Sequence, residues 1–227
     1  MGRSADHVRV NDILLGPLER PALQWLAAHS PSWLTPNMCT AVGVFGSLVT
    51  LVGYVLSRVH PGFFWLATFG FAINWYGDSL DGTLARYRHI ERPVYGFFID
   101  HTTDAITQVM VFVGLGLSPY VSFNIAVMTL VAYLLLSVLV YVRTCVVAEF
   151  KISYGMLGPT EARALAVLLN TAMFFFGERF WRLGLAGLGP YVVSPYDLAV
   201  GAIGLLLFYF FLSTTTREGI RLSRISR

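Results

Sequence analysis

The stretch that decides the fold reads Asn74-Trp-Tyr-Gly-Asp-Ser-Leu-Asp-Gly-Thr-Leu-Ala-Arg86 and, after a basic loop, Gly96-Phe-Phe-Ile-Asp-His-Thr-Thr-Asp104. It carries four aspartates between apolar segments: Asp78, Asp81, Asp100 and Asp104. A carboxylate at the centre of a bilayer costs about 2.5–3.5 kcal/mol. Four of them together therefore need compensation, and a divalent cation is the simplest source of it.

The spacing of the aspartates predicts two acidic helix faces. Asp78 and Asp81 are three residues apart, and Asp100 and Asp104 are four apart. Residues with these spacings lie on one side of a helix. Two such helices packed together are expected to aim all four carboxylates at one point, as helix bundles do in metal sites.

The composition indicates an integral membrane protein. Of its 227 residues, 56% are hydrophobic and 13% charged, and the mean hydropathy is +0.63. A soluble domain of this size carries about 25% charged residues. No cleavable signal peptide is expected at the polar N-terminus. Cys39 and Cys145 are expected to be small buried apolar residues, since two such cysteines make neither a disulfide framework nor a metal knuckle.

Six segments match the roughly 20 apolar residues that a transmembrane helix needs. They lie near 37–59, 62–86, 93–117, 119–148, 159–177 and 195–214. A shorter amphipathic helix near 11–29, expected to lie in the membrane interface, has an apolar face of Leu15, Leu18, Ala22, Trp25 and Leu26. The expected fold is thus all-α: an N-terminal part (1–34) with this interfacial helix, a six-helix transmembrane catalytic domain (35–216) and a basic tail (217–227).

The basic residues predict the orientation of these spans. With both termini cytoplasmic, thirteen of the 16 Lys and Arg fall on the cytoplasmic side, and only Arg58, Arg179 and Arg182 lie outside. Cytoplasmic loops of membrane proteins carry such an excess. The cytoplasmic set is Arg3, Arg9, Arg20, Arg86, Arg88, Arg92, Arg143, Lys151, Arg163, Arg217, Arg221, Arg224 and Arg227. The aspartates then lie near the cytoplasmic surface, which soluble or lipid substrates reach.

The residue types suggest chemistry at phosphorus. Carboxylate oxygens without His or Cys at ligand spacing favour Mg²⁺, Mn²⁺ or Ca²⁺ over zinc. Four carboxylates are enough for two cations, and paired cations suit displacement at a phosphoryl centre. Small residues on the same faces, Gly82, Ala85 and Gly96, leave room for a ligand or serve close helix packing. Arg86 is a candidate phosphate ligand or a topology anchor.

The pattern Asp78-x2-Asp81-Gly82-x2-Ala85-Arg86 followed by Gly96-x3-Asp100-x3-Asp104 resembles the signature of the CDP-alcohol phosphotransferase family. The segment Thr35-Pro-Asn-Met-Cys-Thr40 resembles the start of the family's first membrane helix. Nine residues separate Arg86 from Gly96, where the family usually has seven or eight. The extra residue falls in the basic loop, where insertions are tolerated.

The resemblance implies an activity in phospholipid biosynthesis. Members transfer a phosphate-linked group from a CDP-linked donor to a hydroxyl acceptor and release CMP. By similarity, Asp78, Asp81 and Asp100 ligate Mg²⁺ or Mn²⁺, two ions in all, and Asp104 is the general base and touches a metal as well. Gly82, Ala85, Arg86 and Gly96 adjoin the nucleotide. Family members are commonly homodimers, so a homodimer is expected here.

The substrates stay open at this stage. One branch of the family uses CDP-diacylglycerol and a soluble alcohol, and the other uses a CDP-amino alcohol and diacylglycerol. The dipeptide Asp100-His101 resembles the second branch, although an interfacial or packing role explains His101 better. Arg143, Arg163 and Lys151 are candidates for an acceptor phosphate, and Arg143 is alternatively one half of a structural ion pair.

Two other classes compete with the transferase. The main alternative is a divalent-cation or proton-coupled transporter that uses the same carboxylates. Transporters often show internal repeats and interrupted helices, and this chain shows neither clearly. A catalytically dead scaffold is disfavoured by the presence of all four aspartates. The basic tail is expected to bind anionic lipid rather than nucleic acid.

Overall fold

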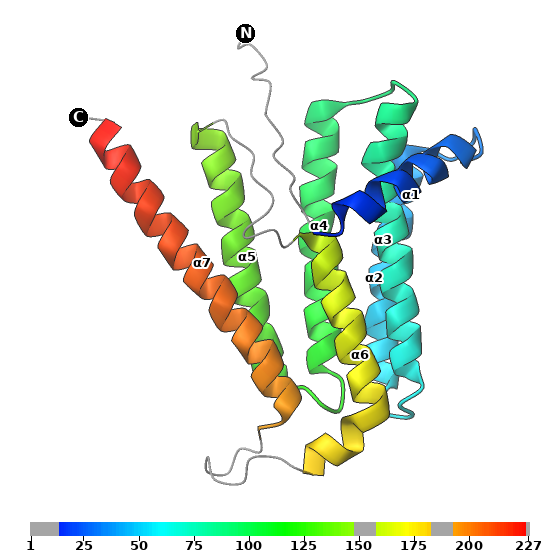
Figure 1. Cartoon of the computed structure of the whole chain (residues 1–227), viewed down its shortest axis with the longest axis vertical. Coiled ribbons are helices and arrows are strands. Elements are labelled where there is room, and N and C mark those ends of the chain that lie inside the picture. Colours follow the sequence, from blue (N-terminus) through cyan, green and yellow to red (C-terminus); the bar gives the residue numbers. More distant parts are fainter. Residues whose placement is uncertain (1–13, 148–157, 183–192, 226–227) are drawn as a thin grey trace.

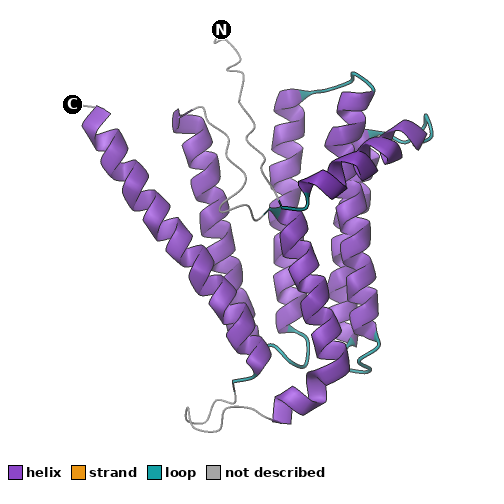
Figure 2. Cartoon of the chain, viewed as in Figure 1, coloured by secondary structure: helices purple, strands orange, loops and turns teal. Residues whose placement is uncertain are grey.

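The computed structural model describes residues 14–147, 158–182 and 193–225, and within this part every regular element is a helix (Figure 2). The helices are α1 (Gly16–His29), α2 (Pro36–Leu56), α3 (Phe63–Tyr87), α4 (Pro93–Gly116), α5 (Phe123–Val147), α6 (Pro159–Arg182) and α7 (Pro195–Ile225). The all-α prediction is confirmed for these residues. Arg3, Arg9, Lys151 and Arg227 lie outside them, as does the start of the predicted 11–29 helix.

Proline explains where four of these helices begin. Pro36, Pro93, Pro159 and Pro195 each stand at the first helical position of α2, α4, α6 and α7. Proline suits this position because its missing N–H has no partner there and its φ angle is already helical. At α2 the Thr35 Oγ1 also accepts a hydrogen bond from the Met38 amide at 3.3 Å, which satisfies one exposed donor of the helix end.

Helices α2 to α7 run alternately up and down, so successive helices are antiparallel (Figure 1). The loop between α3 and α4 lies at the same end of the bundle as the end of α7, and α1 lies across α3 near that end. Helix α6 begins partway down the bundle and runs toward the opposite end. The helix ends that carry most of the described basic residues thus share one end, as the predicted topology requires. Arg58 follows α2 at the opposite end.

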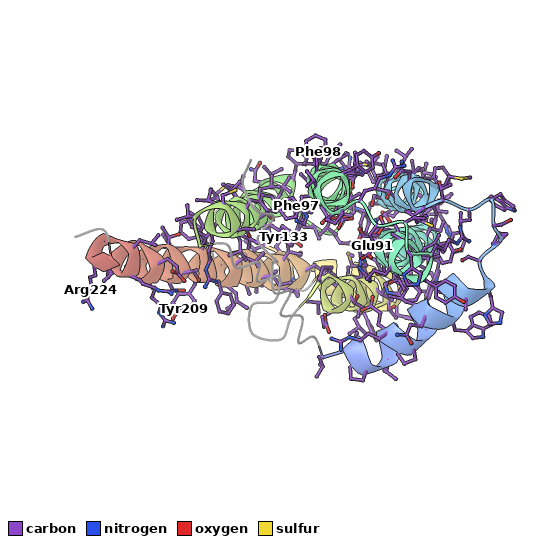
Figure 3. All side chains as sticks on the ribbon, turned by 90° about the horizontal axis from the view of Figure 1, so that it is seen from above. Glu91, Phe97, Phe98, Tyr133, Tyr209 and Arg224 are labelled. Atoms are coloured by element: carbon purple, nitrogen blue, oxygen red, sulfur yellow. The ribbon has the colours of Figure 1, made fainter. Side chains whose placement is uncertain are left out.

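Within the described ranges, three helices, α2, α5 and α7, are long and apolar enough to cross a membrane by length and composition. The other three predicted spans carry the polar side chains of the aspartate-rich stretch or of α6, which lowers their hydropathy. Large apolar side chains also cover the outer surface. Phe98 and Tyr209, 64% and 61% exposed, point away from the bundle (Figure 3). The chain is an integral membrane protein.

Helix α7 continues to Ile225, so the predicted basic tail, 217–227, is helical as far as it is described. Its 31 residues span about 46 Å, which exceeds the roughly 30 Å hydrocarbon core. Cys39 is buried as expected, whereas Cys145 is exposed because it lies on an outward face of α5.

The tightest contact in the bundle joins α2 to α3. A methyl group added at Gly77 would lie 2.6 Å from the Gly43 Cα, and one added at Gly46 would lie 2.8 Å from the Gly70 carbonyl oxygen. Only glycine permits backbones to approach this closely, as in other membrane helix pairs. Helix α1 is held on this pair by Leu23 and Ala27, which pack with Leu80 and Leu84 of α3.

Candidate functional site

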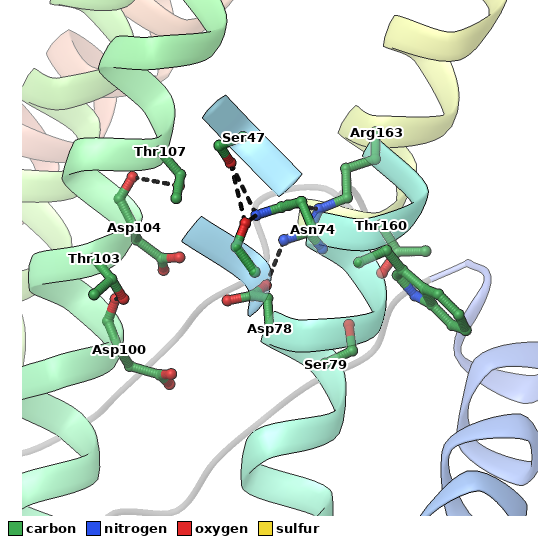
Figure 4. A network of polar contacts seen from close by, with 12 residues as sticks. Ser47, Asn74, Asp78, Ser79, Asp100, Thr103, Asp104, Thr107, Thr160 and Arg163 are labelled. Carbon is green, nitrogen blue, oxygen red and sulfur yellow. Dashed lines mark hydrogen bonds and ion pairs between the residues drawn. The ribbon is translucent and has the colours of Figure 1, made fainter. Parts of the chain in front are cut away.

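The aspartates lie on two facing helices, α3 and α4. Figure 4 shows Asp100 and Asp104 extending from α4 toward Asp78 on α3. Asp81 follows Asp78 by one turn of α3 and is only 7% exposed. The structure thus places Asp100 and Asp104 on one face of α4, opposite Asp78 of α3. The tight glycine contact of α2 with α3 supports this arrangement, because Gly77 immediately precedes Asp78.

Asp81 is held by two hydrogen bonds. Its Oδ2 accepts from the Thr40 Oγ1 of α2 at 2.7 Å, and its Oδ1 accepts from the Gly82 amide at 2.5 Å. These donors offset part of the cost of burying a carboxylate, since hydrogen bonds to a charged group are the stronger kind. Thr40 thus has a role in the site that sequence reasoning did not assign to it.

Asp78 is paired with an arginine from a distant part of the chain. Arg163 on α6 donates its Nη2 to the Asp78 Oδ2, and its Nε donates to the Asn74 Oδ1 at 2.8 Å. The Asn74 amide nitrogen donates in turn to the Gly43 carbonyl oxygen and the Ser47 Oγ of α2, each at 3.0 Å. Arg163 therefore belongs to the aspartate site, and Asn74 orients its guanidinium.

The donor set suits a hard divalent cation, because carboxylate oxygens are the ligands that Mg²⁺ and Mn²⁺ prefer. Within the described residues, no three Asp, Glu, His or Cys side chains are grouped as ligands of one ion. The four carboxylates are therefore not gathered at one point as predicted. One oxygen of Asp78 accepts from Arg163, and both oxygens of Asp81 accept from Thr40 and Gly82. The residue types fit a cation by their chemistry.

A cavity of about 380 Å³ opens beside Asp81 and Asp100 between the ends of α2, α3 and α4. Its walls include the predicted Gly82, Ala85 and Gly96. A methyl group at Gly96 would meet no atom within 4 Å, so Gly96 borders open space and close helix packing is not observed there. The three atoms nearest to a methyl group at Gly82 all belong to the Arg86 guanidinium of the same helix, the closest at 3.3 Å.

Other residues of the cavity wall were not predicted from the sequence. They are Thr35, Pro36, Asn37, Thr40, Ile90, Arg92, Tyr95 and Ile99. The Asn37 amide nitrogen donates to the Tyr95 hydroxyl at 3.1 Å, so α2 and α4 are joined across the opening. Arg86 is not among the lining residues, and its Nη2 donates to the Thr83 Oγ1 at 3.2 Å. A larger cavity, about 470 Å³, lies around residues 116–123 and contains no acidic side chain.

The remaining polar candidates lie elsewhere. Arg143 on α5 forms an ion pair with Glu218 of α7 at 3.0 Å, so its structural alternative is the one observed. The His101 ring packs on Phe97 at 4.2 Å and on Tyr141 at 4.9 Å between centroids. Lys151 lies outside the described residues. Of the three cations predicted for an acceptor phosphate, the structure places Arg163 beside the aspartates.

Known proteins resemble this chain over most of its length. The profile of the CDP-alcohol phosphatidyltransferase family matches residues 33–214. Cholinephosphotransferase 1 of Danio rerio is 26% identical over 177 residues, which cover 73% of this chain and 44% of that protein. An uncharacterized CDP-alcohol phosphatidyltransferase class-I family protein of Dictyostelium discoideum is 27% identical over 186 residues, 77% of this chain and 43% of that protein. The chain spans less than half the length of these curated relatives.

The fold is shared with a solved structure. The crystal structure of Mycobacterium tuberculosis phosphatidylinositol phosphate synthase with CDP-DAG bound superposes with a TM-score of 0.56 and 17% sequence identity. The superposition covers 87% of this chain and 91% of that one. At this identity the likeness concerns the fold alone. The family match over residues 33–214 includes all four aspartates, and the resemblance seen in the sequence is confirmed: the chain belongs to the CDP-alcohol phosphatidyltransferase family.

Proposed function

We propose that this chain transfers a phosphate-linked group from a CDP-linked donor to a hydroxyl acceptor and releases CMP, as a step of phospholipid biosynthesis. The observation that carries the proposal is the facing of Asp78 on α3 with Asp100 and Asp104 on α4, beside a cavity whose walls include Gly82, Ala85 and Gly96. Family membership supports it, and the transporter alternative draws no support from the relatives.

The proposed roles follow from position and chemistry. Asp78, Asp81 and Asp100 would hold Mg²⁺ or Mn²⁺, and bound cations would neutralise the donor's diphosphate. Asp104 would accept the proton of the acceptor hydroxyl, which requires hydrogen-bond reach of that hydroxyl. Asp104 lies one turn deeper along α4 than Asp100, away from the α3–α4 loop. This separation leaves the cavity side of the cluster to the nucleotide.

The cavity is the proposed place of the CDP moiety. Gly82 and Gly96 have no side chain to fill it, and Arg92 contributes a positive charge to its wall. Arg163 is a second cation beside the aspartates, and its guanidinium fork suits a phosphate oxygen pair. The acceptor is proposed to approach from the side of Asp104 and Arg163, where an acceptor phosphate would find a partner.

Both donor branches remain candidates for this chain. Cholinephosphotransferase relatives favour a CDP-amino alcohol with diacylglycerol as acceptor. The fold neighbour was solved with CDP-DAG bound, and a CDP-diacylglycerol donor would require a soluble alcohol. One assay serves both branches because CMP is released in each case, and the donor that supports CMP release identifies the branch.

We propose further that all six helices α2 to α7 cross the bilayer and that α1 lies in the membrane interface. Leu18 and Trp25 of α1, 76% and 61% exposed, face away from the protein and suit contact with lipid. The end that carries the basic residues would face the cytoplasm, together with the aspartates. A homodimer is expected from the family and is tested by the mass of the detergent-solubilised protein.

The test is CMP release by purified protein in detergent with Mg²⁺ or Mn²⁺. CDP-diacylglycerol, CDP-choline and CDP-ethanolamine are each compared against diacylglycerol, serine, glycerol phosphate and inositol phosphate. We expect acceptor-dependent CMP release that EDTA abolishes and that Asp104→Asn reduces by at least about 100-fold. Asp197→Asn makes the same chemical change at the other end of the bundle, where the carboxylate accepts from Ser122 and Ser194. It controls for loss of stability, and it should lower the melting temperature while the folded protein keeps its activity. Full activity of Asp104→Asn would refute the base assignment.

A further inference from the structure

One carboxylate oxygen of helix α1 accepts three hydrogen bonds from the site helices. The Glu19 Oε1 accepts hydrogen bonds from the Trp75 Nε1 at 2.8 Å and the Ser79 Oγ at 3.0 Å, both on α3. It also accepts from the Thr160 Oγ1 of α6 at 2.8 Å. Figure 4 places Ser79 and Thr160 on the side of Asp78 that lies toward α1. Three donors from two helices thus converge on one residue of α1.

A second carboxylate also joins the first turns of α1 and α6, but it lies on α6 and accepts from α1. The Glu161 Oε1 of α6 accepts from the Leu15 amide at the start of α1, at 2.8 Å. Its Oε2 accepts from the Gly158 amide at 2.9 Å, which is the reciprocal bond of a capping box. Both helix N-termini carry partial positive charge, so a carboxylate between them is stabilised. We name the group Glu19, Thr160 and Glu161 the α1–α6 clasp.

The α1–α6 clasp fixes the turn of α6 that precedes Arg163. Thr160 precedes Arg163 by three residues and therefore lies about one turn away on a similar face. At the other end of the side chain, Asn74 fixes the guanidinium through its Oδ1, and α2 holds Asn74 through Gly43 and Ser47. The Arg163 side chain is 15% exposed and the Asp78 side chain 25%. The arginine is thus held at both ends and directed at Asp78.

We propose that the α1–α6 clasp positions Arg163 as a fixed counter-charge on Asp78, and that this counter-charge limits the affinity of the aspartates for a divalent cation. The inference rests on the proposed function only in that it takes the aspartates to bind a cation. The guanidinium satisfies an oxygen of Asp78 that a cation would otherwise use. Its positive charge also opposes a second positive charge at the same carboxylate. Thr160 and Glu19 act through Arg163 and are positioning residues.

The direction of the effect separates this role from a structural one. Loss of a contact that only stabilises the fold loosens the site and weakens cation binding. Removal of a counter-charge instead strengthens cation binding. We therefore expect Arg163→Gln to bind Mn²⁺ about tenfold more tightly, because a charge this close shifts proton binding to a carboxylate by at least that factor. Thr160→Val should bind about threefold more tightly, the equivalent of one net hydrogen bond.

The experiment measures Mn²⁺ affinity of the full chain in detergent by the electron paramagnetic resonance signal of free Mn²⁺. Thr160→Ser keeps the hydroxyl and should restore the wild-type affinity. Arg163→Lys keeps the charge and should stay within about twofold of wild type. In the Arg163→Gln background, Thr160→Val should add no further gain, because the clasp acts only through the arginine.

Two matched variants serve as controls. Ser79→Ala removes a bond that ties Glu19 to α3 and leaves the bond to α6. Arg143→Gln removes an arginine whose side chain is equally buried, at 15% exposure, on α5. Neither should tighten Mn²⁺ binding. If Arg163→Gln fails to fold, the Thr160→Val and Thr160→Ser pair carries the test.

The outcomes are distinct. Tighter binding in Arg163→Gln and Thr160→Val, without a gain in the double variant, supports the inference. Wild-type binding with unchanged or weaker affinity in these variants overturns it and leaves the proposed function standing if CMP is released. A wild-type chain that binds no Mn²⁺ overturns the cation role in the proposed function and the inference with it.

Discussion

Replacement of Gly77 by alanine should separate α2 from α3 and so disturb the aspartates. The added methyl carbon would lie 2.6 Å from the Gly43 Cα and closer still to the Gly43 amide nitrogen and the Cys39 carbonyl oxygen. Carbon atoms in contact are optimally about 3.5–4.0 Å apart. These neighbours are backbone atoms, which have no rotamer to change. The two helices must therefore move apart by about 1 Å.

The magnitude follows from this displacement. Overpacking of a well-packed contact costs about 1–3 kcal/mol, and for a chain of this size 1 kcal/mol corresponds to about 2–4 °C in melting temperature. The loss in activity should be larger in proportion, because Asp78 is the next residue. A misplacement of about 1 Å costs on the order of 100-fold in rate.

The assay combines thermal melting in detergent with acceptor-dependent CMP release. Gly219→Ala is the matched control, since a methyl group there meets no atom within 4 Å. It should leave activity unchanged and raise the free energy of unfolding slightly, because alanine favours a helix by about 1 kcal/mol over glycine. A Gly77→Ala protein that melts within 1–2 °C of wild type and keeps more than about half its activity would refute the reasoning.

Three further changes test other parts of the structure. Glu218→Gln removes the charge that pairs with Arg143 and Arg221 and should lower the free energy of unfolding by about 3 kcal/mol, as measured by thermal melting. Asp197→Ala removes acceptors of the Ser122 amide, the Ser122 hydroxyl and the Ser194 amide, and should cost about 2 kcal/mol in the same assay. Gly82→Ala should fold normally, because its nearest neighbour is the Arg86 Nη1 at 3.3 Å. It should weaken CMP binding in calorimetry by about tenfold, since the methyl group enters the cavity.

The helix positions are largely encoded by local signals. The predicted segments near 37–59, 62–86 and 93–117 agree closely with α2, α3 and α4, because proline begins two of these helices and the apolar stretches are continuous. The ends of α5, α6 and α7 differ by several residues from the prediction. In α7 the hydropathy falls after residue 214, which marks the end of the predicted membrane span. Helix propensity does not fall there, so the helix continues.

The candidate site likewise has one part that local sequence predicts and another that depends on tertiary packing. The spacing of Asp78, Asp81, Asp100 and Asp104 is local information, because helical periodicity alone decides which face a residue takes. The partner of each charged side chain is not local. Arg143 and Arg163 look alike as isolated cations in apolar segments, and only the packing of α5 on α7 and of α6 on α3 separates them.

What the sequence by itself determined is therefore the class of protein, the helices, the acidic faces and the family. These properties follow from hydropathy, periodicity and a long motif within two adjacent helices. Only the tertiary structure decided that Arg163 pairs with Asp78, that Arg143 pairs with Glu218, and that Glu19 joins α1 to α3 and α6. Such pairs connect residues as many as 141 positions apart. Their formation depends on how helices cross, and neither composition nor periodicity specifies that crossing.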